Sequence, residues 1–213
     1  MNSPTRHSPP TVFLVDDETA VRTAISRLFR SAGIAVAAFA SATEFLTSYD
    51  PAVPGCLLLD VAMPGLDGLG LQQALSGRGS PLPIIFLSGH ADVPISVEAM
   101  KSGAVDFLTK PVLEEALLAA VRTAFERDRV ARLARAETDD ILACLATLTP
   151  REREVMEHVV AGQLNKQIAG DLGTAEQTIK IHRARVMEKM KVQSVAELVR
   201  LADLARLAAP PRV

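Results

Sequence analysis

The stretch CLLLDVAMPGLDG, residues 56–68, decides how the first part of the chain folds. Four consecutive apolar residues lead to Asp60, and a turn containing Pro64 and Gly65 follows. An unbroken apolar run of this length between Gly55 and a Pro-Gly turn predicts a strand covered on both faces of a sheet. Asp60 would end that strand at the carboxyl edge, where open α/β sheets bind ligands. Because a buried, unpaired carboxylate is costly, we expect a cation or a proton beside Asp60.

Similar apolar runs stand on both sides of this stretch and alternate with segments of helical spacing. Strict alternation of strand and helix with short connections predicts a parallel, doubly wound α/β sheet with helices on both faces. The five expected strands are residues 12–15, 34–39, 56–59, 84–87 and 105–108.

Polar side chains follow four of these five strands, and parallel strands all present their carboxyl ends at one edge of the sheet. Taken singly, each residue has a plainer interpretation, such as a helix cap for the Asp-Asp pair. Convergence from four strands favours a site instead. Its expected members are Asp16, Asp17 and Glu18 after the first strand, then Asp60, Ser88 and Lys110.

The charges at this edge predict a magnesium-dependent phosphoryl acceptor. Two carboxylates about 4 Å apart repel by roughly 4 kcal/mol at an effective dielectric of about 20, so Asp16, Asp17 and Asp60 need a cation to stay ionised together. Oxygen ligands with retained waters select Mg²⁺. Asp60 would then be the nucleophile, while Lys110 supplies a positive charge and the Ser88 hydroxyl a hydrogen bond.

Composition is typical of a globular protein with no membrane association. The chain has 213 residues, enough for two modest domains, and contains no uncharged apolar run of 18 residues. The first ten residues lack the apolar middle of a signal peptide and predict a disordered lead-in. Cys56 and Cys144 form no motif, which favours structural thiols in a reducing cytoplasm. We therefore expect a cytoplasmic protein.

Charge is unevenly distributed, although the formal net charge is only −2. Residues 1–127 carry 9 Lys and Arg against 13 Asp and Glu, a net charge of −4, whereas residues 146–213 carry 11 against 8, a net charge of +3. This asymmetry indicates a cation site in the first part and an anionic partner for the last part. The excess is too small to establish nucleic-acid binding alone.

The last third of the chain predicts a small helical bundle. Helix-start patterns open at Thr149, Thr174 and Ser194, and a short helix from Asn165 ends at Gly173. A short helix, a tight turn and a second helix indicate a helix-turn-helix. The expected core comprises Val155, Val159, Ile168, Leu172, Ile179, Val186, Met190, Leu198 and Val199.

The second helix of this pair, expected at residues 175–190, has one apolar side and an opposite side suited to DNA. Lys and Arg would bind guanine or phosphate, and small apolar groups would contact thymine methyls. The alternative is an ordinary bundle with a basic exposed helix. The DNA-facing side is expected to present Gln177, Lys180, Ile181, Ala184 and Arg185.

The first part of the chain resembles a bacterial two-component receiver domain of the FixJ type, through VFLVDDE, LLLDVAMPGLDG and LPIIFLSGHADVPISVEAMKSGAVDFLTKP. The resemblance implies a flavodoxin-like sheet in the order 2-1-3-4-5 and phosphoryl transfer from a sensor histidine kinase to Asp60. It also implies a cis peptide between Lys110 and Pro111. The implied Mg²⁺ ligands are Asp17, Asp60 and the Ala62 backbone carbonyl, with Asp16 acting through water.

The same resemblance implies a switch. Ser88 would move toward the phosphoryl group and Phe107 would rotate inward behind it, which changes the 93–107 face through which activated receivers of this type dimerise. Phe107 as a plain core residue is the alternative. His90 is either a solvated loop residue or an influence on the lifetime of the phosphoryl group.

The last part resembles the LuxR-type DNA-binding domain through LTPREREVMEHVVAGQLNKQIAGDLGTAEQTIKIHRARVMEKMKVQSVAELV. The resemblance implies that the final helix, residues 195–207, pairs two such domains on DNA. Residues implied to face base edges are Lys180, Ile181, Ala184 and Arg185, and those implied near phosphates are Asn165, Lys166, Thr178 and Lys189.

We therefore predict four segments: a lead-in (1–10), a receiver (11–127), a helical linker with a solvated charged face (128–145), and a LuxR-type helix-turn-helix domain (146–209). The linker helix could instead assist dimerisation or inhibit the output domain.

The predicted function is phosphorylation-dependent regulation of transcription by a homodimer bound to paired half-sites in double-stranded promoter DNA, with RNA polymerase as a further candidate partner. The chain would be no enzyme beyond its own phosphoryl transfer and autodephosphorylation. An aspartyl phosphatase would need an acidic residue where Ala62 stands. The alternative is a DNA-binding regulator whose receiver is a phosphate-independent dimerisation module.

Overall fold

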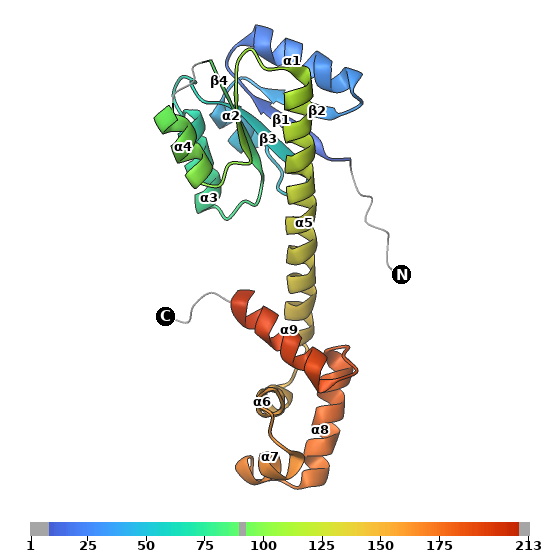
Figure 1. Ribbon diagram of the computed structural model, residues 1–213. Helices are drawn as coiled ribbons and strands as arrows, with labels where there is room; N and C mark the ends of the chain where they lie inside the picture. Colours follow the sequence, from blue (N-terminus) through green and yellow to red (C-terminus); the bar gives the residue numbers. More distant parts are fainter. Residues whose placement is uncertain (1–8, 90–92, 209–213) are drawn as a thin grey trace. The chain divides into compact units, whose positions relative to one another are not determined.

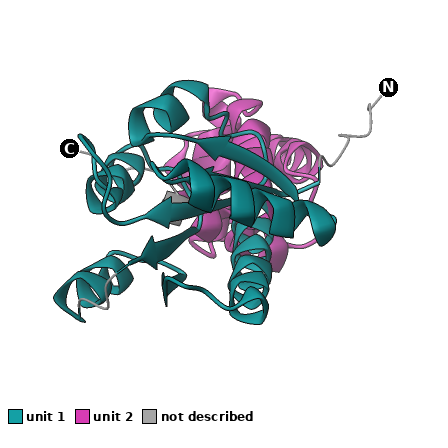
Figure 2. Cartoon of the chain, turned by 90° about the horizontal axis from the view of Figure 1, so that it is seen from above, with its two compact units in different colours: residues 1–132 teal, residues 133–213 magenta. Residues whose placement is uncertain are grey.

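The structure is a computed structural model that describes residues 9–89 and 93–208. His90 and all but the last two residues of the expected lead-in lie outside the described residues. The chain divides into two compact units, residues 1–132 and residues 133–213 (Figure 2). Each unit is considered by itself below.

The first unit contains a five-stranded parallel sheet in the order β2-β1-β3-β4-β5 (Figure 1). The predicted flavodoxin-like α/β architecture is therefore confirmed. Val15 lies opposite Leu59 in the β1–β3 register, which brings the residues that follow them, Asp16 and Asp60, to the same edge. The strands are β1 (Thr11–Val15), β2 (Ala35–Phe39), β3 (Gly55–Asp60), β4 (Ile84–Ser88) and β5 (Asp106–Thr109).

Helices cover both faces of this sheet. Side chains alternate between the faces along each strand, so each strand contributes to two separate apolar clusters. Leu57 and Leu59 of β3 pack in one apolar cluster with α2 (Ala42–Ser48), α3 (Gly68–Gly77) and α4 (Val93–Lys101). Cys56 and Leu58 pack in the other cluster with α1 (Thr19–Ser31) and α5 (Glu114–Ala146). All six residues of β3 are buried, as its unbroken apolar run predicts.

Helix α5 spans 33 residues and crosses the division between the units. The predicted continuous helix is present, but the prediction that the mixed charges of residues 128–145 lie on a solvated face is wrong at Asp128. Asp128 is only 2% exposed within the first unit, and Ile141 is 5% exposed in the core of the second. The sequence does not show that Asp128 and Ile141 are buried, because one is charged and the other is a single apolar residue.

The second unit contains the end of α5 and four further helices: α6 (Pro150–Val160), α7 (Asn165–Asp171), α8 (Glu176–Lys189) and α9 (Val195–Ala208). Thr149 and Glu152 form the predicted capping box at the start of α6. The core contains seven of the nine expected residues as fully covered side chains, whereas Leu172 and Val199 are half-buried. Across residues 9–89 and 93–208, no helix is both long and apolar enough to cross a bilayer.

The close approach of β1 and β3 predicts that Gly55→Ala destabilises the first unit by about 1–3 kcal/mol, because an added methyl overpacks the site. A Cβ at Gly55 would lie 2.0 Å from the backbone oxygen of Thr11. Gly77→Ala at the end of α3 is the matched control, since no atom lies within 4 Å of its added Cβ. Thermal unfolding followed by circular dichroism measures both variants. Equal melting temperatures would contradict the prediction.

Candidate functional site

Three charged side chains from three strand ends meet at the carboxyl edge of the sheet. The Lys110 ammonium lies 2.7 Å from Asp16 Oδ2 and 2.7 Å from Asp60 Oδ1. Asp16 is 0% exposed and Asp60 is 4% exposed, so both carboxylates are removed from bulk water. The predicted convergence of Asp16, Asp60 and Lys110 is therefore observed.

Backbone groups complete the coordination of the two carboxylates. The Ala62 N–H donates to Asp60 Oδ2 at 3.0 Å, and the Glu18 N–H donates to Asp16 Oδ1 at 2.9 Å. Each carboxylate therefore has one oxygen on the Lys110 ammonium and the other on a peptide N–H. Hydrogen bonds to the charged form favour ionisation, so this arrangement supports two buried anions around a single cation.

Burial raises the pKa of the Asp60 carboxyl above its usual range, and the Asp16 charge acts in the same direction. Hydrogen bonds from Lys110 and from the Ala62 N–H oppose this rise. For Lys110, burial lowers the pKa of the ammonium, but the hydrogen bonds and charges of Asp16 and Asp60 outweigh burial and raise it. Lys110 therefore stays charged at neutral pH and links the two acids.

Of the two predicted switch residues, Ser88 lies beside this cluster and Phe107 packs against the apolar core. Ser88 ends β4 and is 8% exposed, and its backbone carbonyl accepts a hydrogen bond of 2.7 Å from the Lys110 N–H. Phe107 on β5 is half-buried, and its ring centroid lies 6.1 Å from that of Phe86. The peptide bond between Lys110 and Pro111 is cis, as expected.

The donor atoms expected for Mg²⁺ are brought together only in part. Asp16 and Asp60 share Lys110, while Asp17 and Ala62 are exposed at the same edge. Among the residues that the structure describes, no three His, Cys, Asp or Glu side chains form a group able to hold a metal by themselves. The available donors are carboxylate and carbonyl oxygens, which fit the hard Mg²⁺ ion in kind.

Two further charged residues lie at this edge: Glu18, which the sequence placed there, and Arg22, which it did not. Glu18 Oε1 lies 3.6 Å from the Lys110 ammonium. Arg22 Nη1 donates to the Asp16 backbone carbonyl at 2.7 Å. Glu18 directly follows the Asp-Asp pair and was expected at this edge together with it. The sequence does not show that Arg22 belongs to this edge, since its contact with the Asp16 carbonyl depends on the path of the chain from β1 into α1.

The outer side of α8 presents the residues expected to face DNA bases. Lys180, Ile181, Ala184 and Arg185 are exposed, whereas Ile179 and Val186 on the opposite side are buried. Ile181 is 47% exposed, which is unusual for a large apolar side chain and suits contact with a partner. Lys180 forms an i,i+4 ion pair of 3.2 Å with Glu176.

The residues expected near phosphates differ in their exposure and in their internal hydrogen bonds. Lys166 is exposed and Thr178 half-buried. The Asn165 Oδ1 accepts a hydrogen bond of 3.1 Å from Arg183, a residue that the sequence analysis left without a role. Lys189 Nζ donates at 2.6 Å to Glu152, which is 2% exposed, and at 3.0 Å to the Thr147 carbonyl. Lys189 therefore has an internal structural partner.

Comparison with known families agrees with this geometry. Residues 12–122 match the response regulator receiver domain, and residues 146–202 match the luxR family of bacterial regulatory proteins. The chain is a response regulator with a LuxR-type DNA-binding domain. Both resemblances inferred from the sequence are thus confirmed.

Relatives of this response regulator match it over nearly their whole length. Nodulation protein W of Bradyrhizobium diazoefficiens is 47% identical over 198 residues, which cover 93% of this chain and 87% of the relative. Transcriptional regulatory protein FixJ of the same species is 44% identical over 90% of this chain and 93% of the relative. The solved structure of response regulator StyR covers 92% of this chain and 99% of its own, with 43% identity and a TM-score of 0.84.

The Glu152–Lys189 pair predicts a pH dependence of the second unit. Hydrogen bonds from Lys189 and from the Thr149 N–H lower the pKa of Glu152 from its usual 4.5 to about 2. Because the folded pKa is the lower one, the stabilisation is complete above pH 4.5 and is lost as the pH falls toward 2.

Thermal unfolding of Glu152→Gln should therefore show a smaller fall in melting temperature than the wild type over this acid range. Glu154→Gln, which removes an exposed ion pair with Arg151 on the same helix, is the control and should behave like the wild type. Identical acid dependence of the wild type and Glu152→Gln would contradict the assignment.

Proposed function

We propose that this response regulator controls transcription through phosphorylation of Asp60 by a sensor histidine kinase. The observation that carries the proposal is the Lys110 ammonium held at 2.7 Å from both Asp16 and Asp60 at the carboxyl edge of the sheet. Lys110 thereby favours the anionic form of the Asp60 carboxylate, against the burial that raises its pKa, at a point where a ligand can approach the exposed Ala62 and Asp17. An anionic carboxylate is the form that acts as a nucleophile.

In the proposed transfer, an Asp60 carboxylate oxygen forms a bond to phosphorus while the bond from phosphorus to the kinase histidine breaks, and the imidazole leaves with that electron pair. Lys110 keeps its contact with Asp16 and offers hydrogen bonds to the new phosphoryl oxygens, and the Ser88 hydroxyl donates another. Asp17, Asp60 and the Ala62 carbonyl would hold Mg²⁺, with Asp16 acting through water, and the ion supplies neutralisation of phosphoryl charge. Water later hydrolyses the acyl phosphate, the only other reaction assigned to the chain.

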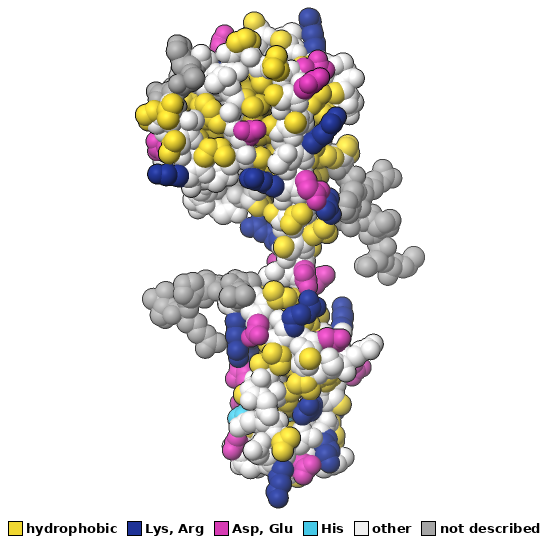
Figure 3. Space-filling model, viewed as in Figure 1, with side chains coloured by type: hydrophobic (Ala, Val, Ile, Leu, Met, Phe, Trp, Pro, Cys, Tyr) yellow, Lys and Arg dark blue, Asp and Glu magenta, His cyan; other side chains and the backbone are white. Residues whose placement is uncertain are grey.

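The proposed readout is dimerisation through the 93–107 face, after Ser88 and Phe107 rearrange. Three apolar side chains at helical spacing on α4 are already exposed: Val93 at 69%, Val97 at 44% and Met100 at 44%. Figure 3 shows hydrophobic side chains gathered over this part of the first unit. An exposed apolar stripe of this kind marks a protein–protein contact more often than a solvated surface.

The proposed output is a dimer that binds paired half-sites in double-stranded promoter DNA. Lys180, Ile181, Ala184 and Arg185 read base edges from α8, and α9 pairs the two DNA-binding domains. Asn165, Lys166, Thr178 and Lys189 lie near phosphates in this proposal. RNA polymerase is a further candidate partner. Because the chain would be phosphorylated by a kinase and then bind promoter DNA, we propose that it acts in the cytoplasm. The proposed segments are those expected from the sequence, with a receiver at 11–127, a linker at 128–145 and an output domain at 146–209.

Acetyl phosphate with Mg²⁺ should shift the wild-type chain from monomer to dimer, whereas Asp60→Asn should remain a monomer, because the amide cannot accept the phosphoryl group. Light scattering coupled to size-exclusion chromatography measures the mass in each case. An equal shift in both proteins would favour the alternative, in which the receiver dimerises without phosphate.

Combined Lys180→Ala and Arg185→Ala should weaken binding to an operator duplex by about 30-fold or more, because each base contact contributes about 1–3 kcal/mol and the two together at least about 2 kcal/mol. Fluorescence anisotropy at a fixed salt concentration gives the affinity, with a duplex selected by the wild-type chain. Arg78→Ala with Arg129→Ala removes the same charge from the first unit and is the matched control. Unchanged affinity of the α8 variant would contradict the assignment of this helix to base reading.

A further inference from the structure

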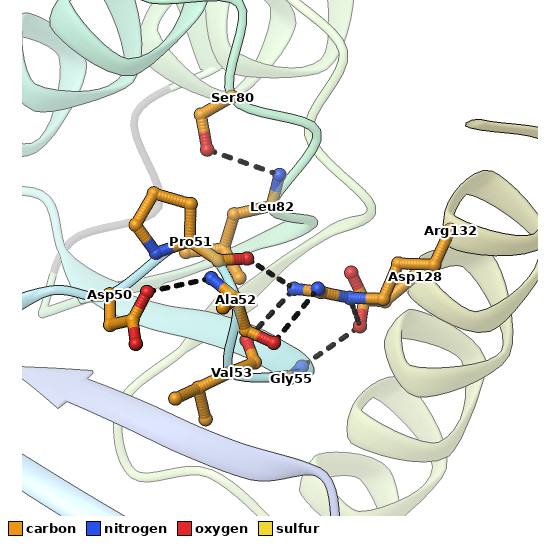
Figure 4. Close-up of polar contacts among 9 residues, drawn as sticks. All are labelled: Asp50, Pro51, Ala52, Val53, Gly55, Ser80, Leu82, Asp128 and Arg132. Atoms are coloured by element: carbon orange, nitrogen blue, oxygen red, sulfur yellow. Dashed lines mark hydrogen bonds and ion pairs between the residues drawn. The ribbon is translucent and has the colours of Figure 1, made fainter. Parts of the chain in front are cut away.

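A buried Asp–Arg pair attaches α5 to the start of the strand that carries Asp60. Asp128 Oδ2 accepts a hydrogen bond of 2.9 Å from the Gly55 N–H and one of 2.8 Å from Arg132 Nε (Figure 4). Arg132 in turn donates to three consecutive backbone carbonyls of the loop before β3: Pro51 at 3.0 Å, Ala52 at 3.2 Å and Val53 at 2.8 Å.

The loop that receives Arg132 is itself shaped to present these carbonyls. Asp50 Oδ1 accepts a hydrogen bond of 2.9 Å from the Ala52 N–H, which closes a turn at the start of the loop. Figure 4 shows the Arg132 guanidinium lying between this loop and Asp128. A planar guanidinium with five donors suits such a set of acceptors, whereas an ammonium does not.

This pair differs from the other charges on the same stretch of helix. Asp128 is 2% exposed and the Arg132 side chain is 27% exposed. Arg129 forms an ion pair with Glu126 in which both side chains are about 60% exposed, at 61% and 59%. The Asp128–Arg132 pair also lies beyond residue 122, where the match to the receiver family ends.

The physical role of such a pair is positional. Asp128 Oδ1 is buried without a hydrogen-bond partner among the described residues, which costs free energy. A buried ion pair contributes little net stability and is best attested as a device that fixes register. The face of α5 against the sheet carries Leu117, Ala120, Val121 and Ala124, and their apolar contacts are non-directional. The hydrogen bonds at Asp128 and Arg132 are directional and join one turn of α5 to the loop before β3 and to Gly55.

We propose that Asp128 and Arg132 lock the register of α5 to the start of β3, so that the first part of the proposed linker, as far as Arg132, stays attached to the first unit and α5 leaves it at one fixed turn. Strand β3 is fully buried and carries Asp60 at its other end. The lock therefore joins the strand that accepts the phosphoryl group to the helix that continues into the second unit. This consequence rests on the proposed function, whereas the lock itself does not.

The test uses the full chain with Arg132→Met, which keeps the aliphatic length and removes the guanidinium, and with Asp128→Ala, which removes the acceptor of both the Gly55 N–H and Arg132. Arg129→Met is the matched control on the same helix. Hydrogen exchange should become at least about fivefold faster at residues 128–136 and at Gly55 in both variants, and should stay at the wild-type rate in the control. Wild-type exchange rates in both variants would overturn the proposal, whatever the chain does on phosphorylation.

A second readout separates the lock from the proposed function. Acetyl phosphate should label Asp60 at the wild-type rate in both variants, while the gain in DNA affinity on phosphorylation falls about fivefold or more, within the range of allosteric couplings. If both variants gained as much DNA affinity on phosphorylation as the wild type does, the proposed coupling between the lock and DNA binding would be overturned. No gain in the wild type itself would contradict the proposed function, and the exchange measurement would still decide the lock.

Discussion

The bridge from the Lys110 ammonium to Asp16 and Asp60 is the interaction on which the receiver depends. Without a cation there, two carboxylates at 0% and 4% exposure would face each other in a site with little water. One lysine from the end of β5 resolves this and ties together the ends of three strands, β1, β3 and β5. The sheet order makes the contact available, because β1 and β3 are neighbours and β5 lies beyond β4 at the same edge.

This arrangement links stability and chemistry. The Lys110 charge that favours the anionic form of Asp60 in the folded chain is the charge that would meet the phosphoryl group in the proposed transfer. Lys110 has both acids as partners, so a bond formed at Asp60 leaves the ammonium its contact with Asp16. In the proposed transfer, Lys110 would therefore stay paired with Asp16 while the charge at Asp60 changes.

The sheet and its edge were accessible from the sequence, because they follow from one strong pattern. The buried run that ends at Asp60 required a covered strand, and the alternation of strands and helices fixed the fold class. The contacts of Arg22 and of the Asp128–Arg132 pair were not accessible. They depend on how a helix leaves or rejoins the sheet. From sequence alone, a charged residue in a helix is predicted to lie in solvent. Lys189 shows the same limit, since a basic residue at the end of α8 gave no sign in the sequence of its partner Glu152.

The hydrogen bond between Arg183 and Asn165 also determines the polarity of a surface. A guanidinium has donors and no acceptor, so the Asn165 carboxamide must turn its oxygen toward Arg183. Its two N–H groups are then directed away from α8. The start of α7 thus offers donors to any acceptor that approaches, and it would repel a second donor. An aspartate at this position would keep the internal bond and reverse the character of the outer surface.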